Sequence, residues 1–144
     1  MDAGGPTWPR TNEESWEQLR EFVAYLAGNP VWSGWVRTAG TILDALARDG
    51  LDRSFRIGSS MHDIMVSTLD HHGLIAEPRT TLTIDLDGTH VRVSYSRSNV
   101  AFEEPDDQVR VPRDEAVPVV RRYLEKLWRE TKPDTPLPAG LAGV

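Results

Sequence analysis

Apolar residues recur at three- and four-residue intervals over the first third of the chain, which predicts amphipathic helices there. Thr11 and Glu14 have the spacing of a capping box, and the pattern that follows ends at Gly28. The apolar positions of this first helix are Trp16, Leu19, Phe22, Val23 and Leu26. A second helical pattern begins at Asn29-Pro30 and ends at Asp49-Gly50. We therefore expect two amphipathic helices before residue 51.

Two glycines lie inside the second helical pattern, at Gly34 and Gly40. A glycine in a helix interior is less favourable than alanine by up to about 1 kcal/mol. The sequence therefore leaves two expectations open: either the helix breaks near Gly40, or another segment of backbone packs closely there.

Polar and apolar residues alternate in TTLTIDLDGTHVRVSYS, which predicts a β-hairpin. Asp87-Gly88 supplies a two-residue turn of the primed type, and this turn fixes the register. The predicted pairs are Ile84 with Val91 and Leu82 with Val93 on the apolar face. Two further strands are expected at Val100–Phe102 and Val109–Val111, which gives an antiparallel meander of four strands.

The stretch SMHDIMVSTLDHH carries three of the four histidines of the chain. We interpret it as a helix with Ser60 at its N-cap and Gly73 just past its end. At 100° per residue, His62 and His71 lie on opposite flanks of that helix. A zinc site needs three or four ligands around one point, so the spacing predicts no metal site within this stretch. A site completed by His90 or by acidic residues elsewhere stays open.

A last helix is expected from Asp114 to about Glu130, on the stripe formed by Val117, Val120, Leu124 and Leu127. The predicted architecture is α+β: two N-terminal helices, a short mixed segment that includes a strand at Phe55–Ile57, the four-stranded meander, and a C-terminal helix, with the helices on one sheet face. We expect residues 1–10 to be a flexible arm, residues 11–131 a single domain, and residues 132–144 an extended proline-rich tail.

Composition and charge narrow the range of functions. The chain has 144 residues, no cysteine and a formal net charge of −6. The lack of cysteine excludes disulfides, thiolate metal sites and cysteine nucleophiles. The negative charge argues against binding to nucleic acid, because such binding needs clustered Lys and Arg. Without a secretory signal pattern or a long apolar run, a cytoplasmic protein that does not enter a membrane is expected.

Three acidic or aromatic features are candidates for contact with a protein partner. Four carboxylates are crowded around Pro105, and another acidic run lies on the first helix. Trp32 lies at the start of the second helix, where its ring is a candidate for exposure. The candidate contact residues are Glu103, Glu104, Asp106, Asp107, Trp32, Glu13 and Glu17. Complementary charge would select a basic partner and speed its association.

Three segments resemble small acidic proteins of high-GC, actinobacterial-type bacteria, some of which are immunity partners of polymorphic toxins. These segments are FRIGSSMHDIMVSTLDHHGL, VRVSYSRSNVAF and RRYLEKLWRETKPDTPLPAGL, within residues 55–141. The resemblance implies a non-enzymatic inhibitor that blocks the active site of a toxin or a nearby surface. It carries over no site residues.

The leading hypothesis is a non-enzymatic, immunity-type inhibitor that uses an acidic surface to neutralise a basic partner such as a nuclease toxin. No catalytic residue, metal ligand or cofactor is predicted, because neither a nucleophile turn nor a phosphate-binding loop occurs. One alternative is a small enzyme or metal-binding protein that uses His62, Asp63, His71, His72 and His90. A second alternative is an assembly module that forms a homodimer through an exposed strand edge or an exposed tryptophan.

Overall fold

The computed structural model describes residues 11–60, 62–68, 78–97 and 104–142. Over these ranges the chain forms four α-helices and five β-strands, with 3-10 turns before α2, β1 and α3. The elements are α1 (Asn12–Leu26), α2 (Ser33–Arg48), β1 (Arg56–Ser60), β2 (Asp63–Ser67), β3 (Arg79–Ile84), β4 (His90–Ser96), β5 (Asp107–Pro112), α3 (Ala116–Thr131) and α4 (Ala139–Ala142).

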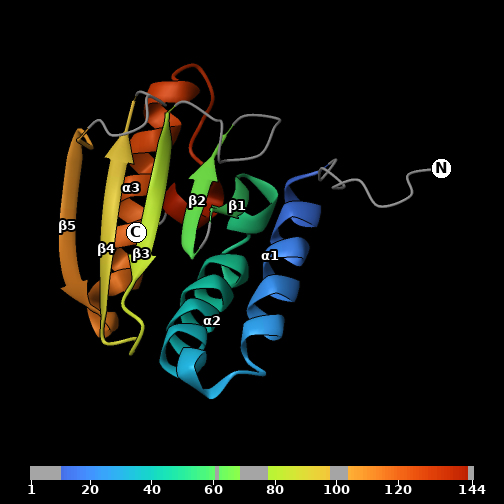
Figure 1. The fold of residues 1–144 in the computed structure, drawn as a ribbon. Coiled ribbons are helices and arrows are strands. Elements are labelled where there is room, and N and C mark those ends of the chain that lie inside the picture. The colour runs from blue at the N-terminus through green and yellow to red at the C-terminus, as the bar shows by residue number, and fades with distance from the viewer. Residues whose placement is uncertain (1–10, 61, 69–77, 98–103, 143–144) are drawn as a thin grey trace.

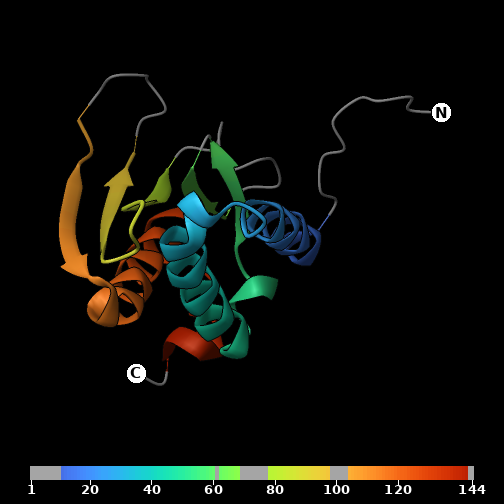
Figure 2. The ribbon, with the colours of Figure 1, turned by 60° about the horizontal axis from the view of Figure 1, so that its bottom comes forward.

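The five strands form one antiparallel sheet in the order β1-β2-β3-β4-β5, with α1, α2 and α3 on one of its faces (Figures 1 and 2). Side chains that face the helices are buried, as the alternating burial along β3 and β4 shows. The predicted α+β class is confirmed, but the sheet has five strands rather than four. The core lies between the two layers, where apolar faces of both are removed from water.

The expected helix in SMHDIMVSTLDHH is wrong over the described part of that stretch. Ser60 is the last residue of β1 rather than a helix cap, and Asp63–Ser67 form β2. Ile64 and Val66 alternate with more polar neighbours and point into the core. Pairing with β1 on one side and β3 on the other supplies partners for the backbone, and this tertiary pairing outweighs the local helical pattern. His71, His72 and Gly73 lie outside the described residues.

The hairpin between β3 and β4 has the predicted register, with Ile84 opposite Val91 and Leu82 opposite Val93. Gly88 takes a positive φ of 77° at the turn, which glycine adopts without strain. The expected strand at Val100–Phe102 lies outside the described residues, and β4 pairs directly with β5.

Helix α1 seals the β1 edge of the sheet. As predicted, the Thr11 side chain caps this helix by accepting a hydrogen bond from the Glu14 amide. The hydroxyl of buried Ser15 accepts a hydrogen bond of 3.0 Å from the outward-facing amide of Ile57. The Trp16 indole donates one of 2.9 Å to the carbonyl of Phe55. Side chains of α1 thus satisfy backbone groups that an edge strand would otherwise present to solvent.

The hairpin turn is fastened to the first turns of α2, and this contact explains Gly34. A Cβ atom on Gly34 would overlap the main chain of Asp87. The Thr38 hydroxyl donates to the carbonyl of Gly88 at 2.6 Å. At Gly40 neither expectation holds, because the helix continues unbroken and a Cβ atom would meet nothing within 4 Å. The close backbone approach occurs about 1.7 turns earlier, at Gly34.

The C-terminal helix is present as α3, but it begins after a 3-10 turn at Arg113–Glu115, and Asp114 does not cap it. Residues 132–138 contain no helix or strand, whereas Ala139–Ala142 form α4. Leu141 in α4 is buried in the core. The end of the described chain is therefore packed on the domain rather than extended away from it.

Candidate functional site

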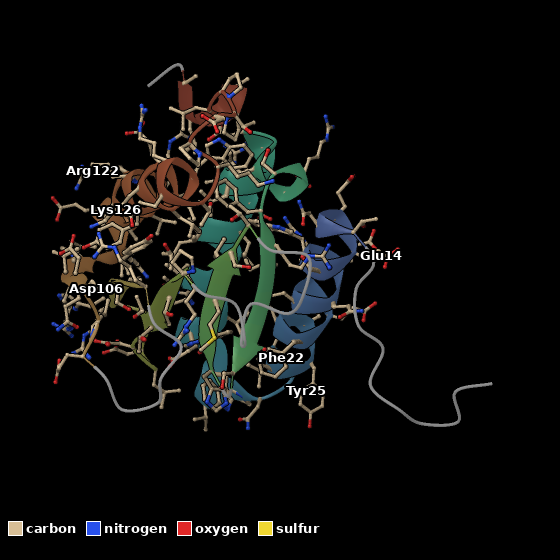
Figure 3. All side chains as sticks on the ribbon, turned by 90° about the horizontal axis from the view of Figure 1, so that it is seen from above. Glu14, Phe22, Tyr25, Asp106, Arg122 and Lys126 are labelled. Atoms are coloured by element: carbon tan, nitrogen blue, oxygen red, sulfur yellow. The ribbon has the colours of Figure 1, made fainter. Side chains whose placement is uncertain are left out.

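The two predicted acidic regions lie on opposite sides of the molecule (Figure 3). Glu13 and Glu17 belong to α1, which covers β1 at one end of the sheet. Asp106 and Asp107 lie at the start of β5, at the other end. Glu103 is outside the described residues. The structure therefore does not gather the predicted contact residues into one surface.

The acidic residues beside β5 are mostly paired with cations. Arg97 bonds to Glu130 at 2.8 Å and lies 3.5 Å from Asp106, and Lys126 lies 3.9 Å from Asp107. Glu104 is exposed. Since these ion pairs neutralise much of the local charge, this region presents a weaker negative potential than its sequence suggests.

The same network shifts the pKa of three groups, and its hydrogen bond to Glu130 raises the pKa of the Arg97 guanidinium. The hydrogen bonds from Arg97 lower the pKa of the Glu130 carboxyl, because they favour its charged form. Burial, together with the negative charge of Glu130, raises the pKa of the Tyr95 phenol. The network therefore has a structural role, because it joins the end of β4 to the end of α3.

Replacing Arg97 with alanine should raise the pKa of Glu130 toward its ordinary value, since the main group that favours its charged form is lost. In the native chain the Glu130 contribution to stability is present above the unfolded-state pKa and is lost as pH falls through the lowered folded-state pKa. Carboxyl-detected NMR titration of both proteins measures the shift. An unchanged Glu130 midpoint in the variant would disprove the assignment.

Helix α1 carries a stripe of exposed side chains at four-residue intervals, which we call the acidic stripe: Glu13, Glu17, Glu21 and Tyr25. At a rise of about 1.5 Å per residue the stripe is about 18 Å long. Its three glutamates form no ion pair with any cation among the described residues. Like charges at this spacing destabilise a helix by about 0.2–0.5 kcal/mol per pair. Glu13 lies in the first turn, where a carboxylate favours the helix dipole, but Glu17 and Glu21 are not explained by the stability of α1.

Tyr25 ends the acidic stripe with a side chain that is 79 % exposed. Figure 3 shows it close to Phe22, at the end of α1 away from Glu14. Val31, in the turn between α1 and α2, is also exposed, as is Leu86 in the β3–β4 turn. Val31 and Leu86 line one shallow depression of about 570 Å³. The sequence argument missed these three residues, although the spacing from Glu21 to Tyr25 was a usable signal.

Trp32 is half-buried instead of exposed. Its ring packs on His62 with a centroid distance of 3.9 Å and a tilt of 32° between the planes, and it meets Trp35 edge-on at 6.1 Å. Phe22 also stacks on His62 at 6.4 Å. These aromatic contacts join α1, α2 and the β1–β2 turn, and they support the end of α1 from which Tyr25 projects.

The histidines do not form a metal site among the described residues, where no group of three or more ligand-type side chains could hold an ion. The His62 ring packs against Trp32 in the aromatic cluster. The Nδ1 atom of His90 lies 3.0 Å from the Thr89 hydroxyl. His71 and His72 lie outside the described residues. The described part of the chain therefore offers no candidate metal centre.

No protein-family model, curated protein or solved structure matches this chain. In the described ranges, every helix is too short or too polar to cross a bilayer. Function is therefore inferred from the surface of the molecule.

Proposed function

We propose that this chain is a non-enzymatic inhibitor that binds a basic protein partner through the acidic stripe. The observation that carries the proposal is the run of three glutamates that form no ion pair with a described cation and that end in exposed Tyr25. Unpaired carboxylates attract a cationic surface over several ångströms and select against acidic partners. A protruding tyrosine supplies the apolar contact that anchors such interfaces.

The rigidity of α1 supports this role. Ser15 and Trp16 bond α1 to the β1 segment on its inner side, and Arg20 bonds to Asp44 of α2 at 2.8 Å. The outer side chains of the helix are thus presented from a backbone that is already fixed. Less conformational entropy is lost when a partner binds to a fixed surface than to a flexible one.

The immunity-type assignment rests on the resemblance of the three segments to proteins that neutralise polymorphic toxins. A nuclease toxin is a partner of suitable chemistry, because its substrate-binding surface is basic. An acidic helix that occupies such a surface would exclude the nucleic acid. The inhibitor itself then needs no catalytic group.

The test is to purify the products of the genes adjacent to this one and to measure binding by calorimetry. We expect one basic product to bind with one-to-one stoichiometry per chain, and to lose its toxic or nuclease activity in the complex. If no adjacent product binds, or if a bound product keeps its full activity, the inhibitor proposal fails.

A further inference from the structure

The two edges of the sheet are treated differently by the fold. At β1, side chains of α1 bond to the outward-facing groups of Phe55 and Ile57. At β5, the described residues place no such cover, and all its residues except Val111 are exposed. In particular, Val109 is 38 % exposed although it points to the helix side of the sheet, opposite buried Val93. As far as the described residues go, the sheet therefore has one sealed edge and one open edge (Figure 1).

The hydrogen-bond pattern between β4 and β5 shows which backbone groups of β5 point away from the sheet. The amide of Arg113 donates to the Thr89 carbonyl, which fixes the alternation along the β4–β5 ladder. Val109 and Val111 accordingly bond toward β4, and the main chains of Gln108 and Arg110 point away from the sheet. The open edge thus offers two N–H donors, on Gln108 and Arg110, and three carbonyl acceptors, since Pro112 has a carbonyl but no N–H.

We propose that the open edge pairs with β5 of a second copy of this chain, in antiparallel orientation around a two-fold axis at Val109. In this register Gln108 of each copy lies opposite Arg110 of the other. Four backbone hydrogen bonds then use both outward donors of both strands, and Pro112 falls outside the bonded segment. The two Val109 side chains meet on the helix side and cover each other. The β5 edge is therefore self-complementary, since the same residues form both sides of the two-fold interface.

The neighbouring register is less favourable. With Arg110 on the axis, two guanidinium groups would face each other across the strands, and like charges directly opposite destabilise a sheet. In the register centred on Val109, Arg110 keeps its bond to Asp85 at 2.5 Å and gains an uncharged neighbour, Gln108 of the second copy. Both registers allow four backbone hydrogen bonds, so charge favours the one centred on Val109.

Such a dimer would contain a continuous ten-stranded sheet with the sealed β1 edges at its two ends. Because α1 covers β1, the acidic stripes of both copies stay exposed at opposite ends of the dimer. The inference does not depend on the proposed function, since dimerisation uses the other end of the sheet.

Sedimentation equilibrium over about 10 µM to about 1 mM tests the pairing through its concentration dependence. The mass is expected to rise from the 16.1 kDa of one chain toward twice that value. Gln108→Pro removes an outward donor without touching the bonds to β4, and should weaken dimerisation at least about tenfold. Gln108→Ala keeps the donor and should dimerise like the native chain.

Hydrogen exchange of the native chain provides a readout that does not depend on how the proline variant folds. The amides of Gln108 and Arg110 should become protected as concentration rises, while those of Val109 and Val111 are protected throughout. A single-chain mass at every concentration would overturn the proposal. So would a dimer in which the Gln108 and Arg110 amides exchange as freely as in the monomer.

Discussion

Replacing Gly34 with alanine is expected to lower the free energy of unfolding by about 3 kcal/mol, at the upper end of what overpacking costs. The added Cβ atom would overlap the backbone of Asp87, which has no flexible side-chain end that can move aside. The turn must then separate from α2, and the bond between Thr38 and Gly88 is strained or lost. Urea unfolding of the variant measures the change.

Gly40→Ala is the matched control, since both glycines lie in α2 and the substitution is the same. A Cβ atom at Gly40 meets nothing within 4 Å. Alanine should therefore stabilise the chain by up to about 1 kcal/mol through its helix propensity. If the two variants change stability by the same amount, the close approach of the turn to α2 is not what requires glycine at Gly34.

Neutralising the acidic stripe by Glu13→Gln, Glu17→Gln and Glu21→Gln together is expected to weaken partner binding at least about tenfold, mainly through slower association. The same change should alter stability little, because the two repulsive pairs that it removes offset the favourable first-turn carboxylate of Glu13 that it also removes. Stopped-flow association rates, measured at low and high salt, separate this effect from a loss of folding. The difference between native and variant chains should shrink as salt rises.

A second triple variant controls for total charge. Asp114, Glu115 and Asp134 are exposed and form no ion pair with a described cation. Replacing them with Asn, Gln and Asn, respectively, removes the same number of negative charges, but from the region around α3. We expect only a small decrease in association rate. Equal losses in both variants would assign the effect to net charge and would contradict a defined site on α1.

Local signals in the sequence correctly predict those helices and strands for which the hydrophobic periodicity and the capping or turn residues indicate the same element. The Thr11 cap and the register of the β3–β4 hairpin are present as expected. The turn itself differs, because the Gly88 amide donates to the Asp85 carbonyl and the central residues are Leu86 and Asp87 instead of Asp87 and Gly88. The helix expected from Ser60 is wrong over the described residues up to Thr68, because a segment this short can satisfy both a helical pattern and a strand pattern. The strand forms because this segment pairs with β1 and β3, and a local sequence pattern does not show where those two strands lie.

The candidate surface could be predicted only in part, for a similar reason. Sequence places Glu13 and Glu17 on the outer face of the first helix, because they lie opposite its apolar stripe. It does not show that Arg97 and Lys126 fold against the carboxylates beside β5, since these cations are contributed by other elements. The sequence also does not show that the Trp32 ring packs against His62. Pairing of charges and rings is a tertiary property.

The most direct test of the proposed function is hydrogen-exchange mass spectrometry of this chain alone and in complex with its purified partner. New protection is expected in α1, around Tyr25, and in the turn that holds Val31, with the remainder of the sheet little changed. Protection confined to β5 or to the solvent face of the sheet, with α1 exchanging as in the free chain, would contradict binding through the acidic stripe.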